Sequence, residues 1–242
     1  MFKIKKEHRD LATVPAQLVG SVEQAAAVAR KNLSWLVAGV ALAVVAALAV
    51  GGFLWVRQQE DQAATELLRE GTQIVSARPM GAMPVPRRES EETKKAVELF
   101  RQVLAEFPRS SVAPQAAYLL GNALSDLEEW DGAVSAYQDF LSRYGEHRSL
   151  VPLVSMRLGY AHLSQGKVEE AEKAFSAIVK MHGALNKDQA LFELAKIDER
   201  LNRPEGALAR YQEIMKDHPQ SPFATEASVR IKTLDARKAA EQ

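Results

Sequence analysis

The sequence predicts an all-α chain, with one membrane-spanning helix near the N-terminus followed by an α-solenoid of stacked helical hairpins. Residues 33–56 are uncharged and apolar, and helix-forming Ala, Leu, Glu, Gln, Lys and Arg dominate the chain after them. A motif then recurs at intervals of 36 to 38 residues. Alternating β-branched runs, which would indicate strands, do not occur in that region.

The uncharged run 33–56 has the length of a transmembrane helix, since about 20 apolar residues cross roughly 30 Å of hydrocarbon. Trp35 and Trp55 are 20 positions apart, which places their indoles near the two headgroup layers. The alternative is a cleaved signal peptide, because Ala47-Leu48-Ala49 fits an A-x-A cleavage site. We favour a permanent anchor, because the run is long for a signal peptide and roughly thirty residues precede it.

The orientation of this anchor follows from the basic residues that flank it. Arg30 and Lys31 adjoin its N-terminal side, whereas Arg57 and Arg69 on the other side are accompanied by acidic residues. We therefore expect a single-pass protein of a bacterial inner membrane, with residues 1–32 as a basic cytoplasmic tail and the repeats in the periplasm. Two states remain open for the tail, a short amphipathic helix and a disordered segment.

Small residues recur every four positions along one side of the predicted anchor. Such spacing lets two transmembrane helices approach closely, although it also arises by chance in an Ala-rich span. The residues of this candidate helix-packing stripe are Gly39, Ala43, Ala47 and Gly51.

Composition argues against catalysis and nucleic-acid binding. The residues beyond the anchor carry 25 basic and 28 acidic groups, whereas nucleic-acid binding favours clustered Lys and Arg. The sequence has no Cys, and its five His are scattered without helical ligand spacing, so we expect no metal, no cofactor and no catalytic residue. We predict that the protein is not an enzyme.

The part expected to be exported divides into three segments. Residues 57–76 continue the anchor helix into solvent, and with Leu68 and Gly71 they could supply a degenerate first helix for the repeats. Residues 77–89, rich in Pro, Gly and Met, are expected to form a loop. Residues 90–242 form the repeats, and within them 222–240 read as a C-terminal capping helix with a polar outer side.

The repeat is defined by an alanine followed four residues later by a large apolar or aromatic side chain. The alanines Ala96, Ala133, Ala171 and Ala207 are 37, 38 and 36 residues apart. A small residue lets two antiparallel helices pack closely, and the ring one turn later is expected to plug the joint to the next hairpin. The rings are Phe100, Tyr137, Phe175 and Tyr211.

At these residues the chain resembles the tetratricopeptide repeat, with Leu120-Gly121 and Leu158-Gly159 in the first helix and the alanine and ring in the second. It departs from that pattern by lacking the first-helix Trp and by exceeding the 34-residue period. The longer period implies slightly longer helices or turns. Pro108-Arg109-Ser110 and Pro219-Gln220-Ser221 look like junctions of bacterial envelope repeat proteins.

In such a stack the first helix of each hairpin lines the concave face. Exposed rings and Met beside an amide and an ammonium would suit an extended peptide, although ordinary packing between helices is the other interpretation. Counted from the Leu-Gly landmarks, the concave positions are Tyr118, Asn122, Met156, Tyr160, Phe192 and Lys196.

The layout of tail, anchor and exported repeats resembles the ancillary SecYEG translocon subunit (YfgM-like) family of bacterial inner-membrane proteins. The resemblance implies a membrane-tethered adaptor in protein export or envelope quality control, with the Sec translocon or periplasmic chaperones as partners. Two other functions remain open. One is a structural coordinator of peptidoglycan synthesis or outer-membrane assembly, and the other is a self-associating assembly protein.

Overall fold

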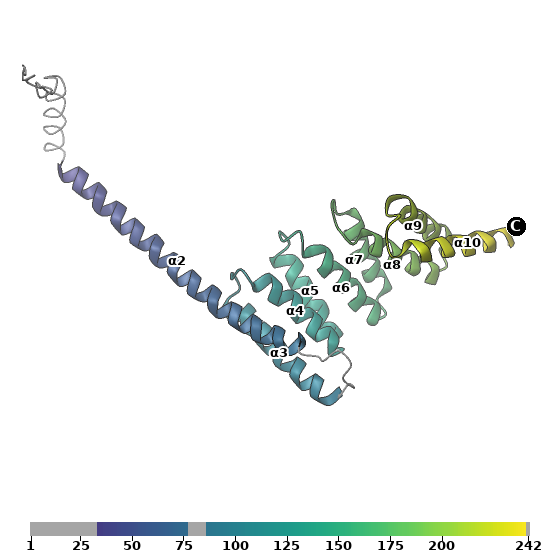
Figure 1. The fold of residues 1–242 in the computed structure, drawn as a ribbon, viewed down its shortest axis with the longest axis horizontal. Coiled ribbons are helices and arrows are strands. Elements are labelled where there is room, and N and C mark those ends of the chain that lie inside the picture. Colours follow the sequence, from purple (N-terminus) through teal and green to yellow (C-terminus); the bar gives the residue numbers. More distant parts are fainter. Residues whose placement is uncertain (1–32, 77–85, 241–242) are drawn as a thin grey trace, which may run out of the picture. The chain divides into compact units, whose positions relative to one another are not determined.

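A computed structural model describes residues 33–76 and 86–240 of the chain, and every regular element in these ranges is an α-helix (Figure 1). The chain divides into two compact units, Met1–Gln58 and Gln59–Gln242. The all-α prediction is confirmed. The predicted tail, residues 1–32, lies outside the described residues.

The first helix, α2 (Leu33–Ser76), is drawn in purple to blue in Figure 1. Its apolar part has a mean hydropathy of 2.5, and none of that stretch is buried in the protein. Trp35 is 80% exposed and Trp55 is 65% exposed. By length and composition α2 can therefore cross a membrane. The helix continues without a break to Ser76, as the sequence predicts.

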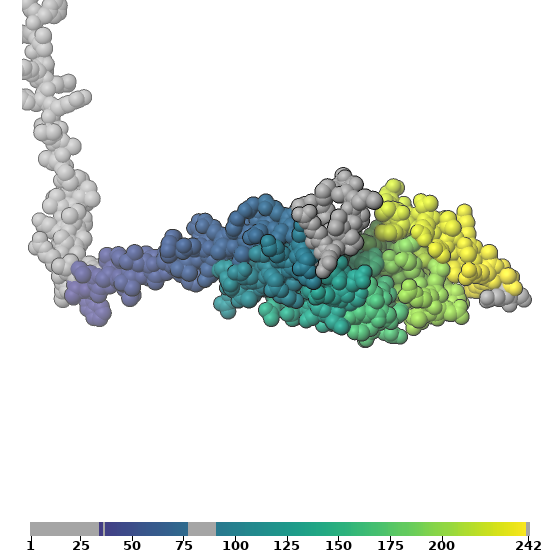
Figure 2. All heavy atoms as spheres, turned by 90° about the horizontal axis from the view of Figure 1, so that it is seen from below, coloured from purple at the N-terminus to yellow at the C-terminus, as the bar shows by residue number. Residues whose placement is uncertain are grey.

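Eight helices follow, and they pack in chain order. Within hairpins α4 packs on α5, α6 on α7 and α8 on α9, and between hairpins α3 packs on α4, α5 on α6, α7 on α8 and α9 on α10. These helices build one continuous stack, seen in Figure 2 from teal to yellow. The bounds are α3 (Pro86–Glu106), α4 (Ala113–Asp126), α5 (Trp130–Arg143), α6 (Val151–Ser164), α7 (Val168–Lys180), α8 (Lys187–Arg200), α9 (Pro204–Asp217) and α10 (Ala224–Ala240).

The predicted loop 77–89 is wrong at its C-terminal end, because α3 already begins at Pro86. Proline is favoured in the first turn of a helix, where its missing N–H would have no partner in any case. Residues 77–85 lie outside the described residues. In the region predicted as the cap, α10 packs on α9.

The repeat motif forms the core. All four repeat alanines and all four rings are fully buried. Three of the four rings lie over a glycine of the first helix in their own hairpin. A Cβ added at Gly121 would overlap the ring of Tyr137, and one at Gly159 would overlap Phe175. The rings therefore lock the two helices of one hairpin together, and their predicted contact with the next hairpin remains a prediction.

Residues 57–76 supply the first helix of the first hairpin, as the sequence suggested. Ala64 and Leu68 are buried in one cluster with Ala96 and Phe100 of α3. A Cβ at Gly71 would come within 2.6 Å of the Phe100 ring, which repeats the glycine–ring arrangement of the later hairpins. The helix that contains the candidate anchor thus ends as part of the repeat core.

The extra length of the repeats lies between hairpins and not in the helices. Turns inside hairpins span only 127–129, 165–167 and 201–203, whereas the joints between hairpins span 107–112, 144–150, 181–186 and 218–223. The short turns share a left-handed residue, at Glu128 (φ 59°), Gly166 (φ 74°) and Asn202 (φ 54°). This conformation closes a helix C-terminus by turning the next backbone N–H onto its last carbonyls.

Candidate functional site

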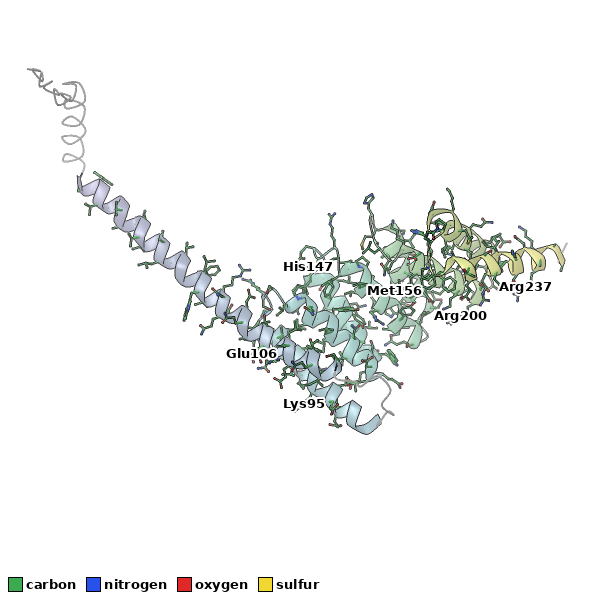
Figure 3. All side chains as sticks on the ribbon, in the orientation of Figure 1. Lys95, Glu106, His147, Met156, Arg200 and Arg237 are labelled. Carbon is green, nitrogen blue, oxygen red and sulfur yellow. The ribbon has the colours of Figure 1, made fainter. Side chains whose placement is uncertain are left out.

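The first helices of successive hairpins approach one another, and their facing side chains define the candidate site, which we call the inner face. It comprises the predicted positions on α4, α6 and α8, and α4 packs on α6 as well as on its hairpin partner. Figure 3 labels Met156 on α6 and Arg200 on α8.

On α4, Tyr118 and Asn122 are both half-buried. The hydroxyl of Tyr137 donates a hydrogen bond of 2.8 Å to Asn122 Oδ1, so this amide is fixed from within its own hairpin. The neighbouring Tyr118 side chain is the largest cause that raises the pKa of the exposed Arg157 of α6. Arg157 therefore places a positive charge near Tyr118.

Met156 and Phe192 differ from the sequence expectation, since each is only 5% exposed. Met156 packs in a cluster with Phe175 of α7. The Phe192 ring stacks on Phe223, with 5.0 Å between ring centroids, and meets Tyr211 edge-on at 5.8 Å. The expectation of exposed side chains at these two positions is wrong, because neighbouring helices cover them.

Tyr160 and Lys196 meet at a carboxylate that the sequence analysis missed. Glu193 of α8 is buried, and its Oε1 accepts hydrogen bonds from the Tyr160 hydroxyl (3.1 Å) and Lys196 Nζ (3.2 Å). The other oxygen lies 2.9 Å from Lys196 Nζ. Gln189 Nε2 donates to the Tyr160 hydroxyl at 3.0 Å. No sequence signal separates Glu193 from an ordinary surface glutamate.

Tyr160, Gln189, Glu193 and Lys196 form what we call the inner-face polar group, and their hydrogen bonds hold these side chains in fixed orientations. Burial, followed by the negative charge of Glu193, raises the pKa of Tyr160, so its hydroxyl stays protonated. Lys196 neutralises Glu193 and lies 5.8 Å from the centroid of the Phe192 ring, with half of its own side chain exposed. The inner face therefore offers hydroxyl, amide and cationic groups that are held in place by neighbours, a combination able to bind peptide backbone and side chains.

A second buried carboxylate, Asp198, was also missed. It forms ion pairs with Arg210 of α9 and with Arg203, and Arg203 Nη1 lies 3.2 Å from Oε2 of Glu172 on α7. Burial of a carboxylate is tolerated when cations pair with it. These four residues connect the hairpin α6–α7 to the hairpin α8–α9, so we assign them to stability and not to ligand binding.

Potential metal ligands and one buried histidine, His162, occur in the described ranges. These ranges contain no group of three or more His, Cys, Asp or Glu side chains that could hold a metal. His162 on α6 is buried, and burial lowers its pKa, which favours the neutral ring in the core. Its position agrees with a packing role.

The candidate stripe Gly39, Ala43, Ala47 and Gly51 lies along the exposed apolar part of α2. A Cβ added at Gly39 or Gly51 would have no other atom within 4 Å. These positions are therefore open to a partner helix, and their use in helix packing remains a prediction.

Comparison with known proteins decides the family. The tetratricopeptide repeat model matches residues 87–147, 118–188 and 156–222, which together cover more than half of the chain. The chain belongs to the tetratricopeptide repeat family. Repeats of this family form protein-interaction scaffolds, and the repeats of this chain indicate such a scaffold.

A solved structure supports the fold. A tetratricopeptide repeat protein from Parabacteroides merdae matches with a TM-score of 0.58 at 14% identity, over 73% of this chain and 61% of its own. This chain thus spans less than two thirds of that protein. MamA matches with a TM-score of 0.46 at 14% identity, over 66% of this chain and 98% of its own. No curated protein matches the chain.

Proposed function

We propose that this tetratricopeptide repeat protein is a membrane-tethered scaffold whose inner face binds polypeptides during protein export or folding in the bacterial envelope. The observation that carries the proposal is the pairing of an exposed apolar helix with a repeat domain on one chain, since α2 runs from the apolar stretch into the first hairpin. Such a chain would localise a protein-binding surface to a membrane.

Membrane tethering is supported by the exposed side chains of α2. Burying apolar surface yields about 25 cal/mol per Å², so a long helix with Leu, Val and Trp on every side is strongly favoured in lipid. The basic residues before this helix support a cytoplasmic N-terminus and a periplasmic repeat domain. The Sec translocon and periplasmic chaperones remain the partners that the resemblance implies.

Peptide binding at the inner face is supported by Tyr118, Asn122, Tyr160 and Lys196, which combine partial exposure with fixed orientation. Extended polypeptides present backbone amides and carbonyls at regular intervals, and such groups pair with side-chain donors and acceptors. Met156 and Phe192 would contribute by supporting this surface from below.

Photo-crosslinking in cells tests the proposal. A photoreactive amino acid replaces Lys196 on the inner face, and the same residue replaces the exposed Lys173 of α7 as a matched control. Crosslinks to many exported polypeptides at position 196 and few at 173 are expected. Capture of one stoichiometric envelope protein would favour a structural coordinator instead. Equal labelling at both positions would reject the inner face as the binding site.

A self-associating assembly protein is the second candidate, favoured by the open space beside Gly39 and Gly51. Replacing both with Ile would separate two packed helices and would reduce resonance energy transfer between labelled copies in a bilayer. Unchanged transfer, at a dilution where labelled copies meet only by association, would count against this candidate.

A further inference from the structure

The joints that precede α6 and α8 enclose a groove that lies apart from the inner-face polar group. It is lined by residues of the joints 144–150 and 181–186 and by the first turn of α6, and its volume is about 800 Å³. We call it the joint groove. His147, labelled in Figure 3, marks the joint before α6.

The joint groove is built by the part of the repeat that exceeds the family's length. The longest interval of the motif, 38 residues from Ala133 to Ala171, contains the longest joint, 144–150. Stacking of hairpins does not require these additional residues, since the motif of this family closes in about 34. The additional residues are therefore available for a function other than stacking, such as binding.

Apolar side chains line the joint groove, and two of them are exposed. Leu185 is 99% exposed, and Leu153 beside it is 44% exposed. Val151, Met181 and Ala184 contribute further apolar surface. Leu185 lies two residues after Gly183, whose φ of 75° turns the backbone sharply and presents the leucine outward.

The charge around the joint groove is one-sided. Its described lining contains Arg148 and His182 and no Asp or Glu. The acidic residue of the same joint, Glu146, lies 3.5 Å from His147 Nε2 instead. Two helices of 14 residues, α6 and α8, also begin at this groove, and neither has a side-chain cap on its first N–H groups. The first turn of α8 already carries Asp188, whereas the first turn of α6 has no acidic residue. Helix N-termini favour negative charge.

We propose that the joint groove binds an extended polypeptide segment that carries large apolar side chains flanked by carboxylates. The apolar side chain contacts Leu185 and Leu153, and the carboxylate pairs with Arg148 at the helix N-termini. A hollow surface formed by two loops fits an inserted side chain better than it fits a flat bilayer. This site is a second protein-binding surface, and it does not depend on which partner occupies the inner face.

The test uses the full chain in zwitterionic nanodiscs and fluorescein-labelled peptides with the core Asp-Leu-Phe-Asp between Ser and Gly residues. Matched peptides carry Lys-Leu-Phe-Lys or Asp-Ser-Ser-Asp. Fluorescence anisotropy is expected to show binding of the first peptide only. Leu185→Ser and Arg148→Glu should each weaken its binding about tenfold, the scale expected for one buried leucine or one desolvated charge pair.

Two controls keep the result specific. Val229→Ser makes a similar polar change at an exposed position of α10 and should leave binding unchanged. Arg148→Glu should also transfer the preference to the Lys-flanked peptide. The proposal is overturned if acidic and basic peptides bind alike, if Leu185→Ser has no effect, or if the site responds only to anionic lipid or to a second copy of the chain.

Discussion

Gly121 and Tyr137 show at the residue scale how this repeat is held together. The glycine has no side chain where the ring lies, and the ring is buried without any exposed surface. Because a buried ring cannot rotate away from an added atom, the glycine is required by packing. Gly132, on α5, lacks that constraint, since its nearest neighbour would be Leu124 Cδ1 at 3.4 Å.

Gly121→Ala should therefore destabilise the protein by about 1–3 kcal/mol, because overpacking shifts the Tyr137 ring. Gly132→Ala, its matched control, should be neutral or stabilising by up to about 1 kcal/mol, because alanine is the better helix former. Urea unfolding followed by circular dichroism measures both. Equal effects of the two substitutions would show that helix propensity, and not the ring contact, decides the outcome.

Burial of Tyr137 also predicts a pH dependence. Burial raises its pKa to about 12, above the ordinary value near 10. The folded state prefers the neutral phenol, so this contribution to stability is complete below about pH 10 and decreases as the pH rises toward 12. Tyr211 shifts in the same direction, mainly through burial and then through its hydrogen bond to Glu199.

Tyr137→Phe should remove that part of the alkaline loss, because it has no proton to release. The free energy of unfolding, measured between pH 8 and 12, is expected to fall less steeply for the variant than for the natural chain. Parallel curves would contradict the role of Tyr137 in the alkaline transition. Losing the hydrogen bond to Asn122 lowers the free energy of unfolding by the same amount at every pH. The change of that free energy with pH therefore reports the titration of Tyr137 separately.

At the element scale, α2 belongs to two environments. Its first part is apolar and exposed, whereas Ala64 and Leu68 are buried against α3. Ser111, which follows α3, donates its backbone N–H to Asp61 Oδ1 at 2.9 Å and adds a further contact to this part of α2. The boundary between the two compact units lies within the helix, at Gln58–Gln59.

A chain that begins at Gln59 should therefore keep the complete first hairpin, whereas one that begins at residue 77 should lose it. The shorter chain exposes Phe100 and gives up the burial of Leu68, which together stabilise by about 3–6 kcal/mol. Hydrogen exchange of α3 measures the difference. Equal protection of α3 in both chains would mean that residues 59–76 contribute nothing to the repeat core.

At the scale of the whole molecule, the repeats and the apolar part of α2 contribute differently to stability. Each hairpin packs on the hairpins next to it, so the stability of the stack is a sum of contributions from hairpins and from the contacts between them. The last helix, α10, closes the stack. The apolar stretch of α2 has no burial of this kind. Its side chains have favourable contacts only if lipid or another protein surrounds them.

Val45→Lys, near the middle of the apolar stretch, should impair membrane integration by about 3 kcal/mol, the cost of a charge at the centre of a span. Ser34→Lys, at the end of the helix, is the matched control and should integrate normally, because its ammonium can reach the headgroups. Resistance to alkaline carbonate extraction measures integration. A periplasmic reporter fused to Gln242 should remain active in the control, and its inactivity would reject the proposed orientation.

The sequence alone determined the features that depend on local chemistry and spacing. The helix class, the repeat alanines and rings, the first-hairpin role of Leu68 and Gly71, and the capping helix all follow from periodicity, because core positions recur wherever helices pack in the same way. The helix beginning at Pro86 was missed, since proline near a loop signals a break as readily as a first turn.

The tertiary structure decided which side chains are buried and which are exposed. Met156 and Phe192 are buried, although the equivalent residue Tyr118 of α4 is only half-buried. Glu193 is buried where Tyr160 of α6 and Lys196 of α8 both bond to it. The joint groove likewise combines two loops that are separated by the length of a repeat. Exposure depends on contacts between distant segments, and spacing along one helix does not encode those contacts.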